Sequence, residues 1–157
     1  MHAQPQKEHE WLHQLIGEWT TEAEAKMGPD KPSEVFKGKE IVRSIGGMWV
    51  MCEGQPSDGT AINIMTLGYD PAKKRFVGTF IGSMMTHQWV YDGQLDVTGK
   101  VLTLDTEGPD FAAEGKMARY KDVIEIKSSD HRLLSSHMLG ADGKWHHFMT
   151  ANYHRTK

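Results

Sequence analysis

The sequence predicts an all-β protein, a closed antiparallel β-barrel of 8–10 strands with one short N-terminal helix, and three observations predict it. Glycine-containing turns such as Asp92-Gly93 and Asp142-Gly143 recur about every 8–12 residues, which is typical of β-sandwiches and barrels. The segments between the turns alternate in polarity, as strands with one buried face do. The connections are short, so consecutive strands are expected to be neighbours, and closure then leaves no sheet edge unpaired.

Residues 7–16 predict the helix, because apolar side chains recur along one helical face: Trp11, Leu12, Leu15 and Ile16. Gly17 is suited to end it. The period then changes to two, and the first strand carries Trp19 and continues to Lys26. The other nine strands are expected at 33–45, 48–54, 61–70, 75–82, 87–92, 100–106, 115–127, 131–139 and 144–154. We expect residues 1–157 to form a single barrel domain, with strands from residue 18 to residue 155.

Composition narrows the classes of partner. The chain has 157 residues, 38% of them hydrophobic, and its net charge of -3 with interspersed signs disfavours a nucleic-acid partner. No apolar stretch approaches the ~20 residues that span a bilayer, and the N-terminal residues lack a signal-peptide core. Cys52 is the single cysteine, which excludes an intrachain disulfide and a cysteine-based zinc site. We therefore expect a cytoplasmic protein without a membrane partner.

Several patches match a known family in order and spacing. They are Glu8-His9-x-x-Leu12-x-x-Leu15-x-Gly17-x-Trp19, Gly38-x-Glu40-x-x-Arg43-x-x-Gly46-Gly47, Gly68-Tyr69-Asp70-Pro71, Phe76-Val77-Gly78-Thr79-Phe80-Ile81 with Ser83-Met84, and Tyr153-x-Arg155. Together they resemble the bacterial family of unknown function DUF1579, over almost the whole chain. The resemblance implies a lipocalin-like or calycin-type barrel and brings no activity with it. Relatives often carry an acidic residue where this chain has Gly82.

Trp19 and Arg155 are expected to close one end of the barrel. They stand at the first and the last strand, where an indole can plug the interior and a guanidinium can stack on it. Such a cation–π contact contributes about 0.5–2 kcal/mol. We therefore expect this pair to stabilise the fold and not to bind a ligand.

Strand parity selects five candidate ligand-binding residues: Glu40, Trp89, Tyr91, Arg119 and His147. Lys37 and Lys39 are expected to face solvent, which places Glu40 on the inner face of the same strand. A buried carboxylate needs a partner, and Arg119, in phase with Met117 and Val123, is the expected one. Trp89 and Tyr91 share one face of their strand, and His147 is in phase with Met149 and Tyr153. A single bulge would reverse every parity that follows it, so His147, on the longest strand, depends most on regular pairing.

The leading functional prediction is a barrel that binds a small apolar or amphipathic molecule. Met84, Met85, Trp89 and Tyr91 cluster in the sequence, and flexible methionines with rigid aromatics suit an adaptable pocket as well as a plain core. No nucleophile or phosphate-loop signature is present, so the pattern favours a binding protein over an enzyme and requires no cofactor.

Two alternatives stay open. One is a haem- or metal-dependent activity in the cavity that uses His137 or His147 with Glu40 and Arg119, for which a metal would still need a third ligand such as Glu40 or His87. The other is a solid barrel that acts in assembly or interaction, with methionines in the core or on the face of a homodimer.

Overall fold

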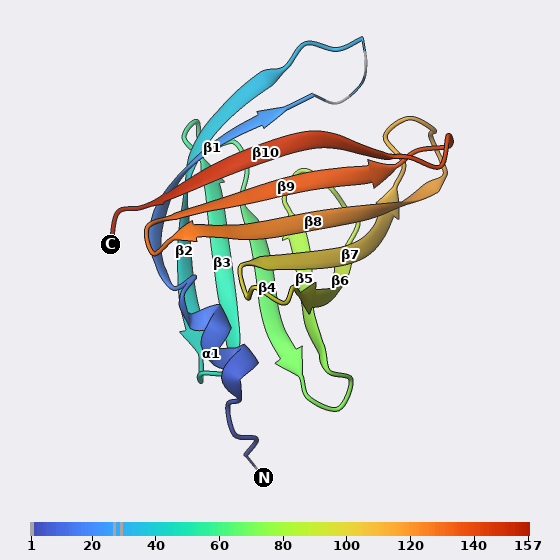
Figure 1. The fold of residues 1–157 in the computed structure, drawn as a ribbon. Coiled ribbons are helices and arrows are strands. Elements are labelled where there is room, and N and C mark those ends of the chain that lie inside the picture. Colours follow the sequence, from blue (N-terminus) through green and yellow to red (C-terminus); the bar gives the residue numbers. More distant parts are fainter. Residues whose placement is uncertain (1, 27, 29) are drawn as a thin grey trace.

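The structure is a computed structural model that describes residues 2–26, 28 and 30–157. Ten antiparallel strands close into one barrel in the order β1-β10-β9-β8-β7-β6-β5-β4-β3-β2, which confirms the predicted fold class (Figure 1). The elements are α1 (Lys7–His13), β1 (Gly17–Ala25), β2 (Glu34–Ile45), β3 (Trp49–Pro56), β4 (Asn63–Asp70), β5 (Arg75–Gly82), β6 (Trp89–Leu95), β7 (Val101–Pro109), β8 (Met117–Ser128), β9 (His131–Leu139) and β10 (Trp145–Arg155). Each strand pairs with its sequence neighbours, and β1 pairs with β10 to close the sheet.

Helix α1 is shorter than the sequence predicts. The α-helix ends at His13, and residues 14–16 continue in tighter turns in which the Leu15 N–H donates to the Leu12 carbonyl at 3.1 Å. Gly17 then takes φ 139°, a conformation that suits glycine, and opens β1. Within the described part of the chain, no helix is both long enough and apolar enough to cross a membrane.

The end of the barrel beneath α1 is closed as the sequence predicts. Trp19 is buried, its Nε1 donates to the Leu15 carbonyl at 2.9 Å, and the Arg155 guanidinium lies 4.2 Å from the centre of its ring. Arg155 also donates to the Ile16 carbonyl at 2.5 Å and to the Gln14 carbonyl at 2.7 Å. One side chain from the last strand therefore satisfies the end of the helix and stacks on the first strand's indole.

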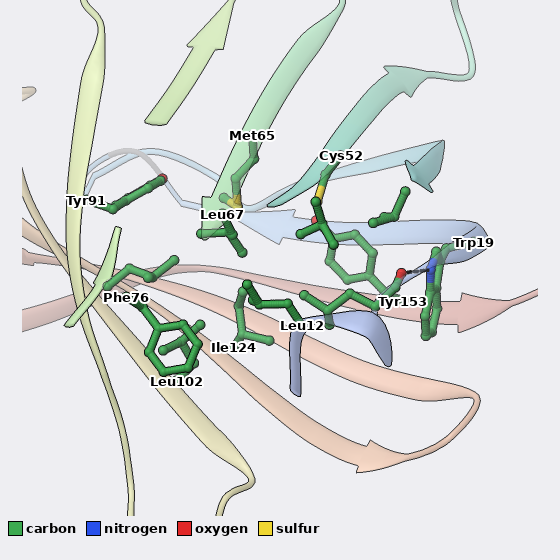
Figure 2. Close-up of a cluster of buried hydrophobic side chains, with 14 of the residues drawn as sticks. Leu12, Trp19, Cys52, Met65, Leu67, Phe76, Tyr91, Leu102, Ile124 and Tyr153 are labelled. Atoms are coloured by element: carbon green, nitrogen blue, oxygen red, sulfur yellow. Dashed lines mark hydrogen bonds between the residues drawn. The ribbon is translucent and has the colours of Figure 1, made fainter. Parts of the chain in front are cut away.

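The hydrophobic core fills the half of the barrel nearest α1. Figure 2 shows Leu12 from the helix reaching into a cluster with Tyr153, Leu67 and Ile124, each from a different strand. The helix thus seals this end with apolar side chains, as periodicity in the sequence requires. The loops β1–β2, β3–β4, β5–β6, β7–β8 and β9–β10 gather at the other end, which we call the mouth.

Candidate ligand-binding site at the barrel mouth

A pocket of about 530 Å³ opens at the mouth between three of its loops and the ends of β9 and β10. Its lining consists of Lys26, Gly28, Phe111, Ala112, Met138, Gly140, Ala141, Asp142, His146, His147 and Phe148. Most of these residues are apolar or small, and the charged ones are Lys26, which directly follows β1, and Asp142 in the β9–β10 loop. The volume lies within the 300–1,000 Å³ that is usual for small-ligand sites.

Aromatic rings support the wall of this pocket. Phe111 from the β7–β8 loop and Phe148 from β10 meet edge to face with ring centres 5.5 Å apart. Tyr120 stands behind both, at 5.4 Å from Phe111 and 6.2 Å from Phe148, and Trp89 packs on Tyr120 at 5.0 Å. Tyr120 is anchored by donating its hydroxyl to the Pro109 carbonyl, and burial raises its pKa to about 12. The wall is therefore neutral and held in place by contacts on its far side.

The rim of the pocket carries the fixed carboxylate of Asp142 and the basic side chains of Lys26, His146 and His147. Asp142 accepts the backbone N–H of Lys144 at 2.9 Å and is 3.0 Å from Nε2 of His146. These two interactions hold the pKa of Asp142 below its usual value. Lys26 closes the opposite side, where its backbone N–H donates to the Phe148 carbonyl at 2.8 Å. A ligand that enters the pocket would meet polar groups at the rim and rings below it.

A β-bulge in β10 brings Phe148 into the pocket wall. The register of β10 against β9 shifts between His147 and Met149, so Phe148 is left without a partner on β9. Ala151 and Tyr153 are buried in the barrel after the shift, whereas before it His147 faces outward. The prediction that His147 points into the interior is wrong for this reason, although His147 does line the edge of the pocket.

The imidazoles of His137 and His147, the two histidines named for a haem or metal site, lie next to each other on the outer face of the barrel and not in its interior. They are paired across β9 and β10 with ring centres 5.0 Å apart. Burial, followed by the neighbouring charges of His147 and Lys121, lowers the pKa of His137. Nowhere in the described ranges do three or more histidine, cysteine, aspartate or glutamate side chains form a group that could hold a metal ion.

Arg119 does not point into the barrel, which corrects the parity assigned to β8. The inward side chains of this strand include Tyr120 and Ile124, and Arg119 on the alternate face is exposed. Met117, whose apolar character suggested an inward face, is itself exposed. Arg119 instead borders a hollow of about 350 Å³ beside the main pocket.

Glu40 faces inward as predicted, but its partner is Arg132 and not Arg119. The Arg132 guanidinium forms an ion pair with Glu40, and both side chains are nearly inaccessible to solvent. The guanidinium carbon lies 4.0 Å from the ring centre of Tyr153 and 4.7 Å from that of Trp19. The Arg132 Nε has no hydrogen-bond partner among the described residues. Glu40 is paired with Trp19 on β1, so this ion pair belongs to the closed end of the barrel and not to the mouth.

Trp89 and Tyr91 both face inward, as predicted, but they contact different groups. Trp89 belongs to the aromatic wall and donates its Nε1 to the Met85 sulfur at 3.0 Å. The Tyr91 hydroxyl donates to Asp122 at 2.5 Å, and the Ser136 hydroxyl donates to the same carboxyl group at 2.6 Å. Burial raises the pKa of Asp122, while these two hydrogen bonds oppose the rise.

The structure therefore separates the five predicted residues into distinct places. Glu40 lies in the core, Tyr91 in a buried polar network, Trp89 behind the pocket wall, and Arg119 and His147 on outward positions. Their contact with a ligand stays a prediction. Sequence analysis missed every lining residue except His147, among them Phe111, Met138, His146 and Phe148. Of these, Phe111 lies in a loop and Phe148 at a bulge, where the alternation of polar and apolar residues does not predict which way a side chain points.

Comparison with known proteins places the chain in a family. The family model described as "Protein of unknown function (DUF1579)" matches residues 4–155. No curated protein matches the chain. Among solved structures, the crystal structure of Rv2717c from M. tuberculosis is similar, with a TM-score of 0.68 and 15% identity, covering 98% of this chain and 100% of that one. At this identity the likeness shows the fold alone.

Two other solved barrels are similar at a lower level. The structure of EF1p2_mFAP2b bound to DFHBI has a TM-score of 0.47 at 12% identity and covers 94% of this chain and 98% of that one. The redesigned β-barrel b11L5F_LGL has a TM-score of 0.40 at 10% identity and covers 92% and 94%. The family match extends from before α1 to the last residue of β10, the whole of the barrel described above. The chain therefore belongs to the DUF1579 family.

Proposed function

We propose that this protein binds a small apolar or amphipathic molecule in the pocket at the barrel mouth. The observation that carries the proposal is the pocket itself, about 530 Å³ with Phe111, Met138 and Phe148 in its walls. Apolar walls with a few polar groups are the usual composition of small-molecule sites. Methionine adapts to the shape of a ligand, and the two rings offer edges and faces on which a planar or aliphatic body can pack.

The rim gives the bound molecule an orientation. Lys26, His146 and His147 are the basic groups of the lining, and Asp142 is already engaged with His146. An acidic or hydrogen-bond-accepting end of the ligand would therefore lie at the rim near Lys26, with the apolar body toward Phe148. Such a ligand matches the amphipathic class that the sequence favoured.

The haem- or metal-dependent alternative has weaker support from the geometry. His137 and His147 meet on the outer face, Glu40 is paired with Arg132 in the core, and Arg119 is exposed at the barrel surface. These groups do not converge on one cavity, so we propose no second function from them.

Titration with the fluorescent probe 1-anilinonaphthalene-8-sulfonate, which is apolar with one sulfonate, tests the proposal. We expect saturable binding to the folded protein. Met138→Trp should fill the pocket and weaken binding at least tenfold, and Phe111→Ala should weaken it by removing one wall. Phe111 is an exposed loop residue, so its replacement spares the barrel.

Val97→Ala is the matched control, because Val97 is fully exposed in the β6–β7 turn at the opposite end of the barrel. Its probe affinity should equal that of the wild type. Thermal unfolding of each variant establishes that it is folded. Absence of saturable binding, or equal affinity in all four proteins, would contradict the proposed site. Native mass spectrometry of the purified protein then measures the mass of any molecule that it retains.

A further inference from the structure

The β5–β6 loop at the mouth carries three potential metal ligands close together. Between the end of β5 at Gly82 and the start of β6 at Trp89 stand Met84, Met85 and His87. Met84 is 58% exposed and Met85 is 37% exposed, so neither side chain adds much to the core. None of the three residues lines the pocket described above. Their polarisable sulfur atoms and imidazole are therefore free to serve another purpose.

Trp89 gives this loop a rigid base. The residue is only 8% exposed, and its ring lies so close to Gly108 that the β-carbon of any other residue there would come within 2.1 Å of it. The ring also packs edge to face on Tyr120, with ring centres 5.0 Å apart. The indole is thus held on β7 and β8, and side chains that contact it are placed with it.

Two of the potential ligands contact this indole. Nε1 of Trp89 donates to the sulfur of Met85 at 3.0 Å. The imidazole of His87 stands perpendicular to the indole, with ring centres 4.8 Å apart. One thioether and one imidazole are therefore gathered around the same ring, although the two residues lie in a loop.

The sulfur of Met84 lies at the same end of the hairpin. Phe80 and Trp89 form the last pair of β5 with β6, and Gly82 and His87 follow two residues beyond it on the two sides of the hairpin. A β-carbon at Gly82 would come within 2.5 Å of the Met84 sulfur. The sulfur therefore occupies the space of the side chain that Gly82 lacks, across the hairpin from the imidazole.

The hydrogen bond of His87 leaves one ring nitrogen available. Nε2 of His87 lies 2.9 Å from the carbonyl oxygen of Glu107, and a carbonyl oxygen can only accept. Nε2 therefore carries the proton, and Nδ1 of the neutral ring keeps its lone pair. Nδ1 forms no hydrogen bond with another described residue. A ring whose second nitrogen donates to a backbone carbonyl is the usual arrangement of a histidine that binds a metal ion.

The chemistry of these donors selects the metal ion. Two thioethers and one imidazole form a soft set without a carboxylate or a thiolate, and thioether sulfur favours Cu(I). Calcium and magnesium ions require oxygen ligands, and zinc sites are built from thiolate, imidazole and carboxylate groups. The electron-rich face of an indole also attracts a cation within about 6 Å of the ring.

We propose that Met84, Met85 and His87 bind one Cu(I) ion beside the indole of Trp89. This site is independent of the proposed function, because it shares no residue with the lining of the pocket. It also differs from the groups of histidine, cysteine and carboxylate side chains considered above, since two of its three ligands are methionines.

Competition with the chromophoric chelator bicinchoninate under nitrogen tests the proposal. The folded protein is added to the Cu(I)–bicinchoninate complex, and the fall in absorbance of the complex measures the Cu(I) transferred. We expect one ion per chain. Met84→Leu, Met85→Leu and His87→Gln should each weaken binding by about tenfold or more, because each removes one ligand while nearly keeping the size of the side chain.

Met117→Leu is the matched control, because Met117 is also 58% exposed but lies on β8. It should bind Cu(I) as the wild type does. Cys52→Ala removes the single thiol, which is the other soft ligand of the chain, and should also leave the affinity unchanged. Thermal unfolding establishes that each variant is folded.

Methyl-13C labelling of methionine in the wild type locates the ion without any substitution. Cu(I) should shift the methyl resonances of Met84 and Met85 and leave that of Met117 in place. The proposal is overturned if bicinchoninate retains all the Cu(I), or if Met85→Leu and His87→Gln bind as tightly as the wild type. Loss of binding in folded Cys52→Ala, or unshifted Met84 and Met85 resonances, overturns it as well.

Discussion

Replacing Arg132 by methionine tests the buried ion pair that ties β9 to β2 across the interior. Arg132 and Glu40 are both nearly inaccessible to solvent, and the guanidinium is also in contact with the rings of Trp19 and Tyr153. Arg132→Met fills a similar volume but leaves the Glu40 carboxylate buried without its partner. Removing one partner of a buried pair costs about 3–5 kcal/mol.

For a chain of 157 residues this loss corresponds to a fall in Tm on the order of 10 °C, because 1 kcal/mol shifts Tm by about 2–4 °C at this size. Glu40→Met should cost a similar amount by leaving the guanidinium unpaired. The double variant Glu40→Met/Arg132→Met removes both charges, and its loss should be far smaller than the sum of the two single losses. Burying two apolar groups of similar size in place of an ion pair is often nearly neutral.

Urea unfolding at pH 7, followed by tryptophan fluorescence, measures all four proteins as a double-mutant cycle. We expect a coupling free energy of about 3 kcal/mol or more. Variants without mutual contact add within about 0.5 kcal/mol. Additive losses would therefore refute the direct pairing of Arg132 with Glu40. A loss below about 1 kcal/mol in Arg132→Met would refute the burial of the pair.

Three further predictions concern the same interior. Trp19→Ala should lower the free energy of unfolding by about 3–5 kcal/mol, measured in urea, and a near-neutral effect would contradict its role in closing the barrel. Burial raises the pKa of Asp122 in the folded protein above its unfolded value of 3.8. The ionised carboxylate therefore lowers the free energy of unfolding at pH values above the folded-state pKa, and this loss disappears below pH 3.8. Asp122→Asn should raise Tm at pH 7, and the gain should shrink toward pH 4. An unchanged or lowered Tm at pH 7 would oppose this reasoning. Burial also raises the pKa of the Cys52 thiol, so labelling by a disulfide reagent at pH 8 should be slow in the folded protein and fast in urea, and rapid native labelling would show that Cys52 is accessible.

Local pattern predicted the elements because each strand's period and each turn's glycine are properties of a few adjacent residues. The ten strands, their antiparallel order and the closed end around Trp19 and Arg155 all agree with these predictions. The turn predicted at Asp92-Gly93 is wrong, because both residues lie inside β6 and pair with β5 and β7. The inward position of Glu40 also followed from its lysine neighbours, since β2 is regular over its whole length. Helix α1 ended earlier than predicted, because its last residues tighten into turns before Gly17.

The alternation of side chains along a strand gave the wrong answer where adjacent residues did not determine which face of the strand points into the barrel. Arg119 was assigned inward from Met117 and Val123, yet those apolar residues stand on the outer face of β8, which the sequence alone did not distinguish from the inner one. His147 was assigned from residues beyond Phe148, and the bulge at Phe148 reversed the alternation between them. A bulge depends on how two strands pair, so it cannot be predicted from the residues of one strand.

The sequence by itself determined the fold class, the order of the strands and the closed end, because turns, periodicity and the first and last strands carry that information locally. Only the tertiary structure decided which groups meet. Arg132 reaches Glu40 across 92 positions of the chain, and Phe111 reaches Phe148 at the mouth. Such contacts are set by barrel closure and strand register, which bring side chains together irrespective of their separation along the chain. The pocket is a property of that closure, and so its residues became visible only in three dimensions.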